Sequence, residues 1–172
     1  AFTLRTEAVC TAEIAVYTST EGRRQAISDL LDVAEAMEEP GEMLYVDSEQ
    51  SRWLLEDTAY ARTWVRRMLK LLDRGFTFRA ALHFSVSVDR FVSFFQMCSP
   101  LIFHRNAHWY YHQYYDENIY WFSFFILEHA MSVTGMSMAT DQTSTTVFTD
   151  AYSILQHRNV FHMVLTSCRP MF

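Results

Sequence analysis

Apolar residues recur at helical spacing in several stretches of the chain. Between residues 23 and 37 they return every three or four positions, which predicts an amphipathic helix over 23–37. A second helix is expected after Asp57, a good N-cap residue, and Gly75 suits its C-terminal end because glycine adopts the left-handed conformation easily. Two further helices are predicted, one over 86–95 that Pro100 ends or bends, and one that begins at Asp150 and finishes before Pro170.

Short runs rich in β-branched and aromatic residues lie between the predicted helices. The strands expected from them cover 12–18, 43–46, 78–85, 121–131 with a polar break, 132–138 and 143–148. Strands and helices alternate in the first half of the chain, which favours a parallel sheet, whereas the run of strands in the second half favours antiparallel pairing. The pattern therefore predicts one α/β domain over residues 1–172, a mixed β-sheet flanked by helices.

Large rings with polar tips are concentrated between residues 103 and 125. This segment holds eleven aromatic residues and three histidines. Tyrosine, tryptophan and histidine each combine an apolar body with a hydrogen-bonding tip, which is typical of recognition surfaces and partly wet pockets. The segment could line a ligand cavity, form a partner interface, or consist of two adjacent aromatic strands.

Composition narrows the classes of function that fit. Half of the residues are hydrophobic and the formal net charge is −6, with Lys70 as the single lysine, so a free-standing nucleic-acid-binding domain is disfavoured. Cys10, Cys98 and Cys168 form no CxxC motif and fit buried thiols in a reducing, cytoplasmic setting. The longest apolar run, 121–127, is far shorter than the roughly 20 residues that span a bilayer, so no membrane is expected. No leader is visible, and a chain that begins at Ala1 is expected to be a segment of something longer.

The spacing of three histidines raises the question of a metal site. His104, His108 and His112 are four residues apart, so on a helix they would share one face. Their tyrosine and tryptophan neighbours favour a strand instead, and on a strand two histidines four residues apart are separated by about 13 Å, too far to share one ion. We therefore expect no metal and interpret the histidines as hydrogen-bonded or pocket-lining.

Polar residues at the expected strand ends are the candidate ligand contacts. Ligands collect at the carboxyl ends of parallel strands, which points to Asp47, Ser48, His83 and Ser85 as a polar rim. On the aromatic strand, alternation places His108, Tyr110, His112 and Tyr114 on one face, with Asp116 beyond them. No glycine fingerprint, GxSxG motif or reactive cysteine is present, so neither a cofactor nor a catalytic residue is assigned.

Seven short motifs, spread over most of the chain, resemble a known family. They are YTS at 17–19, GRRQA at 22–26, LYVDS at 44–48, WLLED at 53–57, SPLI at 99–102, YYHQYYD at 110–116 and CRPM at 168–171. The chain resembles the effector-sensing region that follows an N-terminal helix-turn-helix in a group of bacterial transcriptional regulators, and those regions look related to the phospholipase D fold.

The resemblance implies a sensing role without catalysis. Catalytic members of the phospholipase D superfamily use a histidine, a lysine two residues later and an aspartate beyond, and this sequence has no HxK. It implies a non-catalytic sensor domain that binds an unknown small molecule or peptide, forms a homodimer, and meets DNA only through a domain upstream of Ala1. Two alternatives stay open: a divergent phosphodiesterase or hydrolase around His83, His112 and Asp116, and a protein-interaction module.

Overall fold

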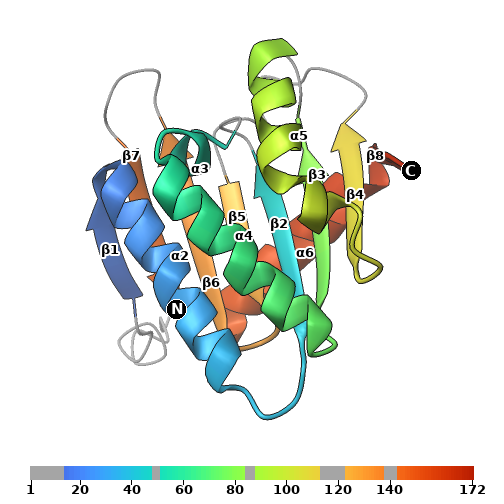
Figure 1. Ribbon diagram of the computed structural model, residues 1–172. Helices are drawn as coiled ribbons and strands as arrows, with labels where there is room; N and C mark the ends of the chain where they lie inside the picture. The colour runs from blue at the N-terminus through green and yellow to red at the C-terminus, as the bar shows by residue number, and fades with distance from the viewer. Residues whose placement is uncertain (1–13, 48–50, 84–87, 113–122, 138–142) are drawn as a thin grey trace, which may run out of the picture.

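One mixed sheet passes through the whole molecule (Figure 1). The computed structural model describes residues 14–47, 51–83, 88–112, 123–137 and 143–172, and within them the sheet has eight strands in the order β1-β7-β6-β5-β2-β3-β4-β8. The strands are β1 (Ile14–Thr18), β2 (Glu42–Asp47), β3 (Thr77–Leu82), β4 (Ala107–His112), β5 (Ser123–Leu127), β6 (Met131–Ser137), β7 (Thr143–Phe148) and β8 (Cys168–Pro170).

The pairing of the strands changes from parallel to antiparallel at the centre of the sheet. β2, β3 and β4 are parallel neighbours, whereas β2 pairs with β5, β5 with β6, β6 with β7 and β7 with β1 in the antiparallel sense. β8 closes the other side, antiparallel to β4. The predicted fold class, a single mixed α/β domain with a parallel first half and an antiparallel second half, is confirmed.

Helices cover the two faces of the sheet unequally (Figure 1). We call the face under the first four helices the front face and the face under the last helix the back face. The front helices are α2 (Ser19–Ala36), α3 (Arg52–Leu55), α4 (Thr58–Asp73) and α5 (Val88–Ile102), and the back helix is α6 (Ala151–Thr166). α4 begins where Asp57 accepts a hydrogen bond from the Tyr60 amide, and α6 begins where Asp150 accepts one from the Ser153 amide, so both expected N-caps are formed.

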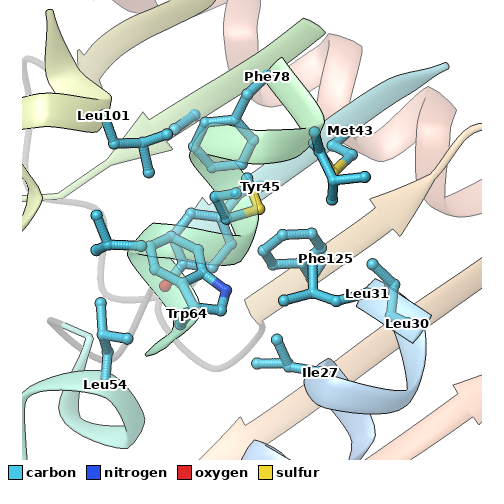
Figure 2. Close-up of a cluster of buried hydrophobic side chains, with 14 of the residues drawn as sticks. Ile27, Leu30, Leu31, Met43, Tyr45, Leu54, Trp64, Phe78, Leu101 and Phe125 are labelled. Carbon is cyan, nitrogen blue, oxygen red and sulfur yellow. The ribbon is translucent and has the colours of Figure 1, made fainter. Parts of the chain in front are cut away.

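Aromatic side chains fill the core between the front helices and the sheet (Figure 2). Tyr45 and Phe125, from neighbouring strands, lie with their ring centroids 5.5 Å apart, and Trp53 meets Trp64 edge to face at 5.6 Å. Such offset and edge-to-face contacts are the favourable geometries for aromatic rings. Trp109, Phe124 and Phe125 are buried too, so the described part of the aromatic segment contributes largely to the core.

A charged network fixes α6 to the back face. Arg158 on α6 pairs with Glu42 on β2 at 3.0 Å, and Glu42 also meets Arg79 on β3 at 3.7 Å. The Arg79 guanidinium lies over the rings of Tyr110 and Phe161, which adds cation–π contacts to the ion pairs. The back core beneath it is smaller and contains Leu44, Val46, Ala81, Phe124, Ile126, Ile154 and Phe161.

The structure corrects the end of one predicted helix. α5 continues past the expected end and contains Pro100 in its last turn. Proline cannot donate to the carbonyl four residues earlier, but the Ser99 hydroxyl donates to that carbonyl, Gln96 O, at 3.4 Å. The polar break expected within the strand-like stretch 121–131 is the turn after β5, where Glu128 has φ of 43° and leads into β6.

Candidate functional site

Buried polar side chains line one edge of the front face. Asp47 ends β2, and because Val46 pairs with Phe124, the adjacent Ser123 of β5 continues the same row across the sheet. The row extends through Gly135 of β6 to Thr145 of β7. Its polar members, with Arg23 from α2 and Ser51 before α3, are called the polar row: Arg23, Asp47, Ser51, Ser123 and Thr145, all buried.

A chain of hydrogen bonds carries the Asp47 carboxylate into the front core. The Ser51 hydroxyl donates to Asp47 Oδ2 at 2.6 Å and lies 3.4 Å from the Tyr45 hydroxyl, which accepts from Trp53 Nε1 at 3.1 Å. Ser51 reaches this position with φ of 54°, in the left-handed region, immediately before α3. Burial raises the pKa of the Cys98 thiol on α5 to about 12, and the negative charge of Asp47 adds to the rise.

Arg23 occupies the space that a side chain at residue 135 would need. It donates from Nε to Thr145 Oγ1 at 3.1 Å and from Nη2 to Ser144 O at 3.1 Å. A Cβ added to Gly135 would overlap the guanidinium, so the glycine is what lets the arginine reach the sheet. Arg23 is only 2% exposed, an unusual position for an arginine on a helix stripe that is otherwise apolar.

The histidines at the ends of β3 and β4 lie apart from the polar row. Tyr45 belongs to the front core, so alternation puts Asp47 on the front face, whereas Tyr110 and His112 face the back, under α6. His83 follows β3 directly, and its ring centroid lies 6.2 Å from that of His112. Burial lowers the pKa of His83 to about 4, with a smaller contribution from His112, so His83 is neutral at pH 7.

The predicted polar rim is therefore divided between two places. Asp47 lies in the polar row, and His83 pairs with His112 instead. His108 shares the back face of β4 with Tyr110 and His112, as the strand interpretation implies, but lies exposed at the opposite end of the strand. The other candidate residues, Ser48, Ser85, Tyr114 and Asp116, lie outside the described residues.

Sequence reasoning missed four members of the polar row: Arg23, Ser51, Ser123 and Thr145. Arg23 carried a visible signal, since it occupies a position of the apolar stripe that continues through Ile27, Leu30 and Ala34. Ser123 and Thr145 carried none, because each joins the row only through the register of strands that are distant in sequence.

A serine–histidine pair on the back face does not resemble a nucleophile. Ser132 Oγ lies 2.8 Å from His157 Nδ1 on α6. The pair lies between β6 and α6, and Asp150 accepts from the Ser153 amide at the start of α6 rather than from His157. Burial lowers the pKa of His157, which favours its neutral form and suits a structural hydrogen bond between strand and helix.

The described part of the chain contains no cluster of metal ligands, no lysine near the polar row and no membrane-spanning helix. Among those residues no three His, Cys, Asp or Glu side chains come together as metal ligands would. Lys70 lies exposed on the outer side of α4, near the turn that leads into β3 and so at the opposite edge from the polar row. No described helix is both long enough and apolar enough to cross a bilayer.

Solved structures with the same fold are found, although no family model and no curated protein sequence matches the chain. NucT from Helicobacter pylori superimposes with a TM-score of 0.65 at 11% identity, over 93% of this chain and 99% of that one. Nuc from Salmonella typhimurium, a phospholipase D family member, gives 0.58 at 9% identity, over 92% and 97%.

A third neighbour is longer than this chain. TrmBL2, an archaeal chromatin protein described with a novel mode of DNA binding, gives a TM-score of 0.56 at 11% identity, over 96% of this chain. The chain spans 56% of the length of TrmBL2. At these identities the likeness concerns the fold alone, and that fold is phospholipase D-like.

Proposed function

We propose that this chain is the effector-sensing domain of a transcriptional regulator and that it binds a small polar molecule at the carboxyl edge of β2 without transforming it. The observation that carries the proposal is the polar row, in which a cation and a carboxylate, Arg23 and Asp47, are both nearly fully buried on one edge of one face. Burying charged groups is costly even when they are hydrogen-bonded, and Arg and Asp are rarely buried this fully in a core. Where local rules of packing are broken in this way, a functional site is the usual reason.

The position of the polar row agrees with a ligand edge. Asp47 ends a strand of the parallel part of the sheet, and in α/β sheets ligands bind beyond the carboxyl ends of such strands. The parallel pairing gives way to antiparallel pairing between β2 and β5, next to Asp47 and Ser123. The polar row offers a cation, a carboxylate and hydroxyl groups at this edge. An effector with both an ionic group and hydrogen-bonding groups would match it.

The distribution of lysine supports binding rather than phosphodiester hydrolysis. The HxK chemistry of catalytic phospholipase D relatives needs a lysine next to the reacting phosphate. The only lysine of the chain, Lys70, lies at the other edge of the sheet. Without a lysine at the edge of the polar row, the domain lacks the catalytic lysine of the HxK motif but can still bind a ligand there.

The role in transcription is inferred from the likeness to TrmBL2 and from charge. TrmBL2 binds DNA, and this chain matches about half of it. With a net charge of −6, this domain is a poor ligand for phosphates by itself, so we assign the DNA contact to a helix-turn-helix outside these 172 residues. A homodimer is the expected assembly, because regulators that read two half-sites are two-fold symmetric.

A thermal-shift screen tests the proposal. The probes are sugar phosphates, nucleotides, amino acids and short peptides, each titrated against the purified chain. A ligand at one hundred times its Kd stabilises the folded state by about 2.7 kcal/mol, roughly 5–10 °C for a domain of this size. The shift should be lost in Asp47→Asn and kept in the matched control Ser132→Ala, which alters a buried serine on the back face. A chain that no probe stabilises, or a shift that survives Asp47→Asn, would contradict the proposal.

A further inference from the structure

The two long front helices carry opposite net charges. α2 and the turn that follows it, residues 19–39, contain six acidic and two basic residues, a net charge of −4. α4 with its C-cap, residues 58–74, contains five basic and one acidic residue, a net charge of +4. The two helices pack side by side on the front face (Figure 1), so an acidic half formed by α2 lies next to a basic half formed by α4.

The basic half includes a row of cations that nothing neutralises among the described residues. Arg62, Arg66 and Lys70 follow each other at a spacing of four on the outer side of α4 and are exposed. None of their side chains makes a hydrogen bond or ion pair within the described ranges. Like charges four apart on a helix destabilise it by about 0.2–0.5 kcal/mol per pair. Arg67, by contrast, faces α2 and binds both Asp32 and Glu35.

The acidic half is also open to solvent. Glu21 at the start of α2 and Glu38 and Glu39 after its end are exposed. The Asp32 and Glu35 side chains stay 67% and 44% exposed although they hold Arg67. Ordinary solvated surfaces intersperse the two signs of charge. Here the signs are separated onto two neighbouring helices, which is the arrangement that a complementary surface needs.

We propose that a second copy of this chain docks on this face, with α2 of each copy against α4 of the other. Both helices run antiparallel to the parallel strands β2 and β3, so they run parallel to each other. A two-fold axis that lies in the interface, parallel to the helices and midway between them, exchanges the acidic and basic halves and preserves helix direction. Glu38 and Glu39 of one copy then face the Lys70 end of α4 in the other. This is an isologous interface.

A second copy fits this face better than a nucleic acid does. A polyanion along α4 would lie about 8–10 Å from the acidic row of α2, the usual spacing of packed helices and about one Debye length at physiological salt. It would therefore feel the repulsion of the acidic row on α2. The second copy meets both halves with the opposite sign.

The size and polarity of the face set the strength of the dimer. Two helices of 16 to 18 residues present roughly 500 Å² on each copy, or about 1,000 Å² in total, the low end for a specific interface. Electrostatic complementarity sets orientation and association rate more than affinity. The dimer is accordingly weak and sensitive to salt. The inference deepens the proposed function by giving its homodimer an interface, but it rests on the charge pattern and needs no ligand.

Sedimentation velocity with charge-reversed variants tests the interface. The wild-type chain should dimerise at tens of micromolar in about 50 mM salt and dissociate in about 0.5 M salt, where screening shortens the range of the charges. Arg66→Glu with Lys70→Glu should be monomeric, and so should Glu38→Lys with Glu39→Lys, because each reversal makes the facing halves alike. An equimolar mixture of the two variants should form a heterodimer, since both contacts again join opposite charges.

A matched control separates this interface from a general effect of charge. Arg169→Glu with Gln156→Glu and Asn159→Glu changes the net charge as much as the basic-row variant but alters exposed positions on β8 and the back helix α6, and it should dimerise as the wild type does. Circular dichroism confirms that each variant is folded. A monomeric wild type, a dimer indifferent to both reversals, or a mixture that stays monomeric would overturn the inference. So would a monomer that binds duplex DNA through Arg66 and Lys70. The thermal-shift screen is independent of these outcomes and tests the proposed function by itself.

Discussion

A single glycine decides how a buried arginine is accommodated. Gly135 leaves room for the Arg23 guanidinium, which in turn bonds Thr145 and the Ser144 carbonyl on β7. The arginine thus ties α2 to the sheet at the edge where Asp47 lies. The position of the Arg23 guanidinium thus depends on α2, β6 and β7 together. It depends in particular on the small size of residue 135.

Replacing Gly135 by alanine should destabilise the protein through Arg23. The added methyl group forces the guanidinium to move, and overpacking of this kind costs about 1–3 kcal/mol. In an Arg23→Met background the same change should cost less than about 0.5 kcal/mol, because the obstructing group is gone. Urea unfolding of the four proteins gives the coupling energy directly. Equal costs in both backgrounds would show that Arg23 is not what fills the space.

His83 should titrate far below an ordinary histidine. Its pKa is about 4 in the folded protein against about 6.5 in an unfolded chain, so the folded state binds fewer protons between these values. The stability that neutral His83 confers is complete above pH 6.5 and is lost as the pH falls towards 4. Proton NMR of the ring gives the midpoint. His112→Ala should raise it only slightly, because burial is the larger cause, and a midpoint near 6.5 in the wild type would refute the assignment.

The N-termini of α4 and α2 are capped by different residues. α4 begins at Asp57, whose carboxylate accepts from the Tyr60 amide at 2.9 Å. α2 begins after Thr18, which makes no side-chain cap hydrogen bond, while the Ser19 hydroxyl accepts one from the Gly22 amide at 3.3 Å. The local hydrogen bond therefore comes from the N-cap residue in α4 and from the residue after it in α2.

Removing each N-cap side chain separates the two cases. Asp57→Ala should lower the free energy of unfolding by about 1 kcal/mol, the usual loss when a cap bond is removed. Thr18→Ala should change it by less than about 0.5 kcal/mol, since no cap bond is lost. Chemical denaturation of both variants measures the difference. The interpretation fails if the two substitutions cost the same.

The elements with a strong local period could be predicted, and the shorter ones could not. The helices over 23–37 and after Asp57 could be predicted because the apolar spacing of each lies within one continuous segment of sequence. α3 and β8 have four and three residues and carry no period. Asp47 could be placed at a strand end from sequence, but its neighbours in the polar row depend on strand register. No local pattern encodes that register, because Ser123 and Thr145 lie far along the chain from β2.

At the scale of the whole molecule, a phospholipase D-like sheet carries its charged groups in two separate places. The polar row lies buried at the edge where β2 ends, and the complementary halves of α2 and α4 lie outside on the front face. We propose an effector for the first and a sister subunit for the second. Because α2 contributes Arg23 to one and its acidic side to the other, the two proposals meet in a single helix.

The proposed function requires that the domain bind its effector at the polar row without cleaving phosphodiesters. The most direct test is the hydrolysis of bis(p-nitrophenyl) phosphate by the purified chain, compared with its His112→Ala variant, from pH 5 to 9. The account predicts nitrophenolate release no faster than the buffer background for both proteins, because Lys70 is at the wrong edge and no other lysine exists. Release by the wild type that His112→Ala abolishes would contradict it and establish the phosphodiesterase alternative.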